Sequence, residues 1–203
     1  MNIRYDAHPL FPSVVHYIEI NDFEQIKKEI IDFVYQEKRI NPKGVKKSNK
    51  GGWQSGNKYH SFDNIIKSTV EDAFRSLSNF KEIFKEDLEY QFTGIWMNIN
   101  KKGDYNILHC HPDSHLAGVL WVDIPKESGK FWCQSSFLYD RFRERSCYTE
   151  YFKKRMLTYD SYYFNPTEGS MLIFPANLNH HVTENKSRHD RISISFNIDI
   201  SIK

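Results

Sequence analysis

The sequence lacks the features that mark secreted and membrane-spanning proteins. It has only three cysteines among 203 residues, and Cys110, Cys133 and Cys147 are too widely spaced for a disulfide framework or a zinc knuckle. No apolar run reaches the roughly 18 residues that a transmembrane helix needs. Residues 1–15 lack the unbroken apolar stretch of a signal peptide. We therefore expect a cytoplasmic protein that does not associate with membranes.

The sequence also lacks an excess of charge of either sign. Its 28 lysines and arginines nearly balance 26 aspartates and glutamates, which gives a formal net charge of +2. This balance offers no electrostatic basis for binding nucleic acid. Aromatic residues, in contrast, make up 15% of the chain, and this abundance favours a fold rich in strands. The length suits one domain with a sizeable core, over residues 1–203.

The hydrophobic periodicity changes at about residue 90. Before it, the pattern predicts a strand at 10–20 and amphipathic helices near 22–37 and 62–78. Asn21 and Glu24 form a candidate capping box for the first helix, and Ser61 is a candidate cap for the second. After residue 90, alternation predicts strands at 90–100, 105–111, 116–124, 129–134, 162–164, 170–174, 181–184 and 191–200. The order indicates an α+β, mainly β fold, with a helical flank at about 1–89 outside a sheet core at about 90–203.

Two polar segments are harder to interpret. Residues 41–60 are rich in glycine and lysine, which is typical of a solvated surface loop. The alternative is a mobile cover over a pocket, with Trp53 or Tyr59 reaching into it. Residues 135–160 are charged and aromatic, and we interpret them as an insertion with about one helical turn.

The last predicted strand has two contrasting faces. Its polar face begins with Arg191 and continues with Ser193 two residues later. In a barrel or jelly roll this polar face would line a wet interior pocket, whereas on an edge strand it would be solvated. Its apolar face is expected to pack under the helices and consists of Ile192, Ile194, Phe196, Ile198 and Ile200.

Two histidines form the most informative local pattern. His109 and His111 are two residues apart, and side chains at this spacing point to the same face of a β-strand. Both imidazoles could therefore bind one metal ion, with His180 as the candidate third ligand. A site rich in imidazole with an open position suits iron, zinc or copper. The alternative is a set of strand histidines that bind no metal.

The segment around these histidines resembles a known family. His109–Val122, HCHPDSHLAGVLWV, resembles the H-x-H-P-x-S-x-L-S-G-V-Y-Y-L segment of a family of 2-oxoglutarate- and Fe(II)-dependent oxygenases found in bacteria and phages. The resemblance covers roughly residues 90–200 and continues in segments 96–99, 105–106, 169–175, 180–182 and 191–197.

This resemblance implies a double-stranded β-helix, or jelly roll, with flanking N-terminal helices and iron at the mouth of the barrel. It implies Fe(II) held by His109, His111 and His180, and 2-oxoglutarate anchored by Arg191 with help from Ser193. Arginine suits this task because its planar guanidinium matches a carboxylate with two hydrogen bonds.

The resemblance further implies the reaction. The protein would be a dioxygenase that consumes 2-oxoglutarate and molecular oxygen, hydroxylates an unidentified substrate, and releases succinate and carbon dioxide. No catalytic residue is expected beyond the metal site, and Tyr105 and Asn106 are expected to contact the cosubstrate or support the ligands. As an alternative role, Asn106 satisfies a turn backbone. The oligomeric state stays open, with a homodimer as one candidate.

The sequence departs from the wider superfamily at one ligand. His111 stands where those oxygenases have aspartate or glutamate, so the site either contains three histidines or is shifted, with His111 and Asp113 as the His-x-Asp pair. We prefer three histidines because Pro112 would disturb the strand between the shifted ligands. The insertion at 135–160 lies near the expected pocket mouth, where it either contributes to substrate selectivity or only decorates the surface.

Two other functions are compatible with the same motifs. One is a non-catalytic jelly-roll binding module, and the other is a cupin-like metal enzyme that does not use 2-oxoglutarate. Arg191 discriminates between these and the oxygenase, because neither alternative needs an arginine at that position.

Overall fold

The computed structural model describes residues 4–5, 12–58, 65–79, 82–85, 88–135 and 148–202. The expectations for Tyr59, Ser61 and residues 136–147 of the insertion fall outside these ranges. The elements follow in the order β1 (His16–Glu19), α1 (Glu24–Ile40), β2 (Asn49–Lys50), β3 (Trp53–Gln54), α2 (Ile65–Ser78), β4 (Leu88–Asn100), β5 (Tyr105–His109), β6 (Leu116–Asp123), β7 (Phe131–Gln134), α4 (Glu150–Met156), β8 (Ser161–Phe164), β9 (Ser170–Pro175), β10 (Asn179–Val182) and β11 (Arg191–Ile202).

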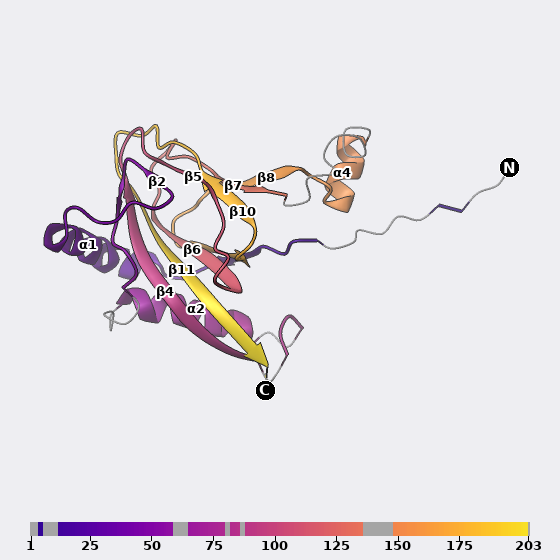
Figure 1. Cartoon of the computed structure of the whole chain (residues 1–203), viewed down its shortest axis with the longest axis horizontal. Coiled ribbons are helices and arrows are strands. Elements are labelled where there is room, and N and C mark those ends of the chain that lie inside the picture. The colour runs from indigo at the N-terminus through magenta and orange to yellow at the C-terminus, as the bar shows by residue number, and fades with distance from the viewer. Residues whose placement is uncertain are drawn as a thin grey trace.

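The strands form two antiparallel sheets. One has six strands in the order β1-β9-β6-β11-β4-β3, and the other has five in the order β2-β5-β10-β7-β8. Helices α1 and α2 lie along the six-stranded sheet beside β4 and β11, whereas α4 stands apart at the other end of the molecule (Figure 1). The predicted α+β, mainly β fold with N-terminal flanking helices is confirmed.

The hydrophobic residues form two layers, one on each side of the six-stranded sheet. The first layer joins the helices to the sheet and includes the fully buried Ile30, Val34, Ile66, Val70, Phe74, Ile192, Ile194, Phe196 and Ile198. The second layer fills part of the space between the sheets with Ala117, Val119, Trp121, Phe131, Cys133, Leu172, Phe174, Ala176 and Leu178. The two faces predicted for β11 are thus confirmed, since its apolar side packs under the helices.

Several predicted boundaries are wrong. Helix α1 begins at Glu24 with Phe23 at the N-cap, whose side chain makes no capping bond, so the predicted capping box does not form. Strand β5 ends at His109, because the backbone N–H of His111 donates to the carbonyl oxygen of Ala176 (2.7 Å) in the turn that follows. Strand β10 begins at Asn179, two residues earlier than predicted, and so includes His180.

Residues 44–57, the bridging segment, connect the two sheets. Its strand β2 pairs with β5 in the five-stranded sheet, and its strand β3 pairs with β4 in the six-stranded sheet. Trp53 is buried against the helical layer, and its indole N–H donates to the carbonyl oxygen of Asn41 (2.8 Å). The segment is therefore neither a solvated loop nor a cover with Trp53 in the pocket. It is a wall tied to both sheets.

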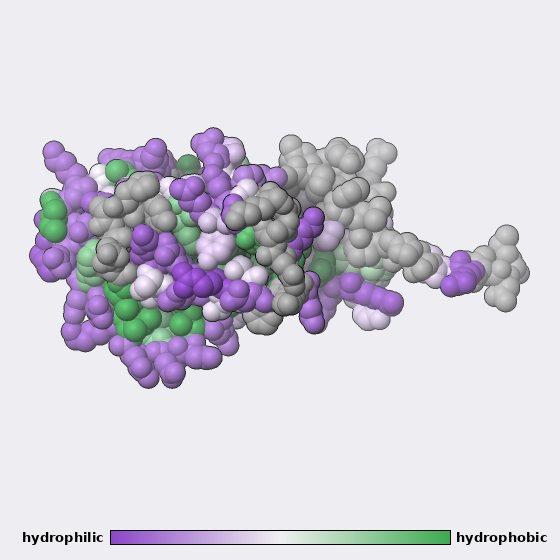
Figure 2. Space-filling model, turned by 90° about the horizontal axis from the view of Figure 1, so that it is seen from below, coloured by the Kyte–Doolittle hydropathy of each residue, from purple (hydrophilic) through white to green (hydrophobic). Residues whose placement is uncertain are grey.

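The outer surface is mainly hydrophilic in the view of Figure 2, with a smaller hydrophobic patch on that face. Among the described residues, no helix has the length and apolar character needed to cross a membrane.

Candidate metal centre

A cavity of about 790 Å³ lies between the two sheets. Residues of both sheets and of the bridging segment line it. The polar face of β11 contributes Ser193, Ser195 and Asn197, as expected for a strand with one face in a wet pocket. His109, His111 and His180 line the same cavity.

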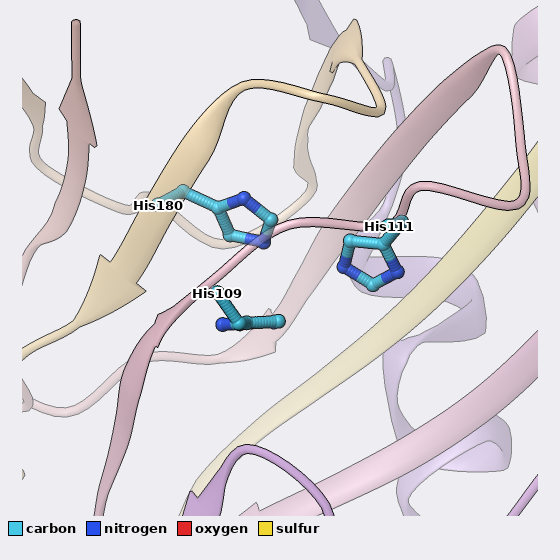
Figure 3. Close-up of side chains that lie close together, drawn as sticks. All are labelled: His109, His111 and His180. Atoms are coloured by element: carbon cyan, nitrogen blue, oxygen red, sulfur yellow. The ribbon is translucent and has the colours of Figure 1, made fainter. Parts of the chain in front are cut away.

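These three histidines converge on one point. His109 and His180 are direct partners in the antiparallel ladder between β5 and β10, and His111 follows two residues after the end of β5. One nitrogen of each ring can be chosen so that all three lie within 4.8 Å of one another. Figure 3 shows the three imidazoles around a shared space. The arrangement can hold one metal ion.

Backbone carbonyl groups fix the orientation of two of the rings. Nδ1 of His109 lies 2.8 Å from the carbonyl oxygen of Ile107, and Nδ1 of His180 lies 2.8 Å from that of Leu178. A carbonyl oxygen can only accept, so Nδ1 carries the proton in both rings. Nε2 therefore keeps its lone pair free for a metal, and such a hydrogen bond on the other nitrogen is typical of metal-binding histidine.

Burial keeps the cluster uncharged. Desolvation, with the neighbouring His109 as a further cause, lowers the pKa of His111 to about 4 and that of His180 to about 3. Burial also lowers the pKa of His109. Neutral imidazole is the form that binds metal ions, so no proton competes with the metal near pH 7.

Aromatic rings hold the histidines in place. The ring of His180 stacks on Phe131 (centroids 5.4 Å apart) and meets Phe174 edge-on (4.8 Å). The ring of His111 stacks on Trp96, with centroids 5.6 Å apart. This packing limits rotation of the two imidazoles and keeps their nitrogens aimed into the cavity.

Two neighbouring polar residues stay outside the cluster. Asp113 is exposed on the turn after His111, and the metal-binding group found among the described residues contains three histidines without a carboxylate. His181 points to the opposite side of β10 from His180 and stacks on Trp132, with ring centroids 6.2 Å apart.

Arg191 is buried, with 1% of its surface exposed. Its Nη1 donates to the carbonyl oxygens of Ser128 and Thr183, the latter at 3.0 Å. Its Nε and Nη2 are buried without a hydrogen-bond partner among the described residues. Burial lowers its pKa to about 10, against a weaker opposite effect of Asp104, so the guanidinium is still charged at pH 7. A buried cation with an unpaired N–H edge favours an anionic partner, and a carboxylate fits that edge with two hydrogen bonds.

Asn106 lines the cavity, whereas its neighbour Tyr105 does not, and Asn106 lies next to a β-bulge between β5 and β10. His180 pairs with His109 and Val182 pairs with Asn106, so β5 has one more residue than β10 between the two pairs. The extra residue brings Asn106 onto the cavity side with His109, and its amide donates to the Ser48 hydroxyl (3.3 Å). Tyr105 is 43% exposed and does not line the cavity. The structure thus gives no support to the expected cosubstrate contact of Tyr105.

Trp96, Asn98 and Gln54 are among the residues that line the cavity, although no cavity role was predicted for them. Trp96 and Asn98 alternate in β4 with residues that face the helices, and Gln54 is the partner of Asn98 on β3. The alternation of polar and apolar residues in β4 could have indicated that Trp96 and Asn98 face away from the helices. No such pattern could have indicated Gln54, because β3 has two residues and a strand that short shows no periodicity.

Comparison with solved structures shows the fold class of this protein. The fold is similar to that of a prolyl-4-hydroxylase from Pseudomonas putida, at 13% sequence identity. The similarity covers 89% of this chain and 91% of that one, with a TM-score of 0.58. HygX from Streptomyces hygroscopicus, solved with nickel and 2-oxoglutarate, is similar at 10% identity, over 92% and 82%, with a TM-score of 0.60. The viral collagen prolyl hydroxylase of Paramecium Bursaria Chlorella virus-1, solved as a 2-oxoglutarate complex, is similar at 15% sequence identity. The similarity covers 90% of this chain and 94% of that one, with a TM-score of 0.54. At such identities the similarity shows a common fold, the double-stranded β-helix.

The family is defined by the sequence itself. A family model described as "Putative 2OG-Fe(II) oxygenase" matches residues 94–197, which is just over half of the chain. The chain therefore belongs to this family of enzymes, whose cofactors are Fe(II) and 2-oxoglutarate. No curated protein is similar enough in sequence to match it.

Proposed function

We propose that this oxygenase holds Fe(II) with His109, His111 and His180 and anchors 2-oxoglutarate with Arg191 and Ser193. One observation carries the proposal. Arg191 does not itself line the cavity, but it lies two residues before the lining residue Ser193 on β11, and it has an N–H edge that no other described residue satisfies. The three-histidine set is preferred over the shifted site because Asp113 lies outside the cluster.

The residues present fit both cofactors. Imidazole nitrogens are suitable ligands for iron, and the two ring orientations fixed by backbone carbonyls leave Nε2 free. When bound, iron and 2-oxoglutarate supply the oxidising chemistry, in which molecular oxygen is consumed and succinate and carbon dioxide are released. The structures of HygX with 2-oxoglutarate and of the viral hydroxylase with 2-oxoglutarate support this assignment.

The chain itself contributes binding, orientation and exclusion of water. Arg191 and Ser193 lie on the same face of β11, so the guanidinium and the hydroxyl can meet one carboxylate. Trp121, Phe131 and Phe174 line the cavity with apolar surface and keep water from the groups they surround. We infer that the reaction is hydroxylation of a primary substrate, which enters the remaining part of the cavity.

Arg191 provides the test. Truncating one member of a buried charged pair costs roughly 2–5 kcal/mol, about 30-fold or more in affinity. Calorimetric titration of the Mn(II)-loaded protein should show this loss of 2-oxoglutarate affinity in Arg191→Ala. Arg191→Lys should lie between, because lysine keeps the charge without the planar pair of donors. Lys130→Ala is the matched control, since the Lys130 ammonium lies over the Tyr163 ring (3.8 Å) outside the cavity.

Two results would contradict the proposal. Wild-type protein that fails to bind 2-oxoglutarate at millimolar concentration would favour the non-catalytic binding module or the cupin-like enzyme. So would Arg191→Ala protein with unchanged affinity.

A cytoplasmic location, one domain over residues 1–203 and homodimer formation stay predictions. Light scattering would test whether the protein forms a homodimer.

A further inference from the structure

One wall of the cavity is not used by the metal or by Arg191. It is formed by β4 and the bridging segment, on the other side of β4 from β11. Gln54, Asn98 and Ser193 lie in one row across β3, β4 and β11, because Asn98 pairs with both of the others. Side chains from this wall that line the cavity include Val45, Gln54, Asn57, Trp96 and Asn98.

Gln54 is the clearest sign that this wall binds a ligand. The residue is 7% exposed and lines the cavity, yet its Oε1 is buried and has no hydrogen-bond partner among the described residues. Oδ1 of Asn197, elsewhere in the same cavity, is also buried without a partner. A buried acceptor left unsatisfied is destabilising, so a bound molecule that donates hydrogen bonds would relieve both.

The wall is built to keep its shape. The buried Asn49 accepts from the backbone N–H of Lys47 (2.8 Å) and donates towards the carbonyl oxygens of Val45, Gly51 and Gly52 (3.3, 3.4 and 3.4 Å). Backbone pairing then attaches the segment to a strand of each sheet. The backbone that carries Gln54 is thus fixed before any ligand arrives.

Apart from Arg191, which the proposed function assigns to 2-oxoglutarate, the lysine and carboxylate side chains of the cavity lie at its rim. Among the described residues that line the cavity, Lys47 and Asp113 are the only lysine, arginine, aspartate or glutamate side chains, and both are exposed. The buried polar groups of the wall are neutral amides and hydroxyls. A carboxylate, phosphate or ammonium of the substrate would lose its hydration there without gaining a counter-ion.

We propose that this wall selects a neutral substrate rich in hydroxyl groups, of the sugar or cyclitol class, whose O–H groups donate to the amide oxygens of Gln54 and Asn197. Two separate acceptors favour a molecule with donors spread around it, which a polyol provides. The proposal rests on the proposed function, since the substrate must bind beside the metal and 2-oxoglutarate.

The experiment uses full-length protein loaded with Mn(II) and 2-oxoglutarate, titrated calorimetrically with two matched pairs of probes. One pair is methyl glucoside and glucuronate, and the other is inositol and inositol 1-phosphate. We expect each neutral probe to bind at least about tenfold more tightly than its charged partner, because the buried wall offers no counter-ion.

Variants then locate the binding. Gln54→Leu should weaken binding of the neutral probes by about tenfold or more, because a site built to accept a hydroxyl hydrogen bond would lose its acceptor. Affinity for 2-oxoglutarate should stay the same. Gln134→Leu is the matched control, because Gln134 lies on β7 and does not line the cavity.

Several outcomes would overturn the substrate class. They are tighter binding of a charged probe than of its neutral partner, tighter binding of a blocked neutral tripeptide than of either polyol, and no binding of either polyol at millimolar concentration. Loss of 2-oxoglutarate affinity in Gln54→Leu would place Gln54 in the cosubstrate site instead. In each case intact 2-oxoglutarate binding by the wild type would leave the oxygenase assignment standing.

Discussion

His180 lies directly opposite His109 in the ladder between β10 and β5, with ring centroids 4.3 Å apart. Cross-strand partners on one face of a sheet have their Cβ atoms close together, so backbone pairing alone brings these two imidazoles to one place. His111 has no such partner strand. Its position depends on the turn after β5 and on stacking against Trp96.

Metal binding should follow this division. His109→Ala or His180→Ala should abolish binding of Mn(II) measured by calorimetry, because each removes a ligand of the cluster. Asp113→Ala and His181→Ala should retain it, since Asp113 lies outside the cluster and His181 faces Trp132 on the other side of β10. Loss of the metal in Asp113→Ala with retention in His109→Ala would instead establish the shifted site.

Gly129 should prove necessary for placing Arg191. It has φ of +103°, and a Cβ there would lie 2.4 Å from the Thr183 carbonyl oxygen and 2.6 Å from Nη1 of Arg191. Gly129→Ala should therefore lower the free energy of unfolding by more than about 2 kcal/mol and weaken 2-oxoglutarate binding. Urea unfolding and calorimetry measure the two effects.

Gly103 supplies the control for this prediction. Its φ is also positive, at +91°, but nothing lies within 4 Å of a Cβ built there. Gly103→Ala should show the backbone strain alone, about 1 kcal/mol, with 2-oxoglutarate affinity unchanged. Equal losses of stability in both variants would mean that the clash at Gly129 is relieved elsewhere.

Cys133 should make the folded protein sensitive to alkali. Burial raises the pKa of its thiol from 9.0 to about 12, so above pH 9 the unfolded chain loses a proton that the folded chain keeps. Stability is therefore fully present below pH 9 and falls as the pH rises towards 12. Between about pH 8 and about pH 10.5, wild type should lose about 2 kcal/mol more unfolding free energy than Cys133→Ala. Parallel pH profiles in urea unfolding would contradict this.

The two faces of β11 should respond differently to truncation. Ile194 is fully buried under the helices, so Ile194→Ala should cost about 2–5 kcal/mol of unfolding free energy. Ser195 faces the cavity and accepts from the Asn98 amide (3.0 Å), so Ser195→Ala should cost about 1 kcal/mol or less. Chemical denaturation compares the two variants. A larger loss for Ser195→Ala would reverse the assignment of the faces.

The long strands could be predicted from the sequence because burial imposes a period on them. β4 and β11 have 13 and 12 residues, long enough for alternation to be visible and to separate core from cavity. The histidine cluster could be proposed for the same reason, since His109 and His111 share one short segment. That segment, with the resemblance, also led to His180 and Arg191.

The remaining features depend on pairing that no local pattern reveals. The bulge that turns Asn106 inward arises from the register of β5 and β10. Two residues of β5 but only one of β10 lie between the His180–His109 pair and the Val182–Asn106 pair. Strands β2 and β3 have two residues each, and their neighbours in the sheets are about 50 residues away in the sequence. The polar composition of residues 41–60 therefore indicated a surface loop, although Asn49, Trp53 and Gln54 are buried.

The alternation along β11 separates two kinds of selective pressure within one strand. Residues that pack against the helices occupy every second position, and residues that face the cavity occupy positions between them. A substitution of Ser195 or Asn197 alters the surface of the cavity, while the apolar residues of the same strand keep their packing. Such a strand allows new substrates to be explored by single substitutions in a protein that still folds, which helps to explain how one architecture can host many different oxidations.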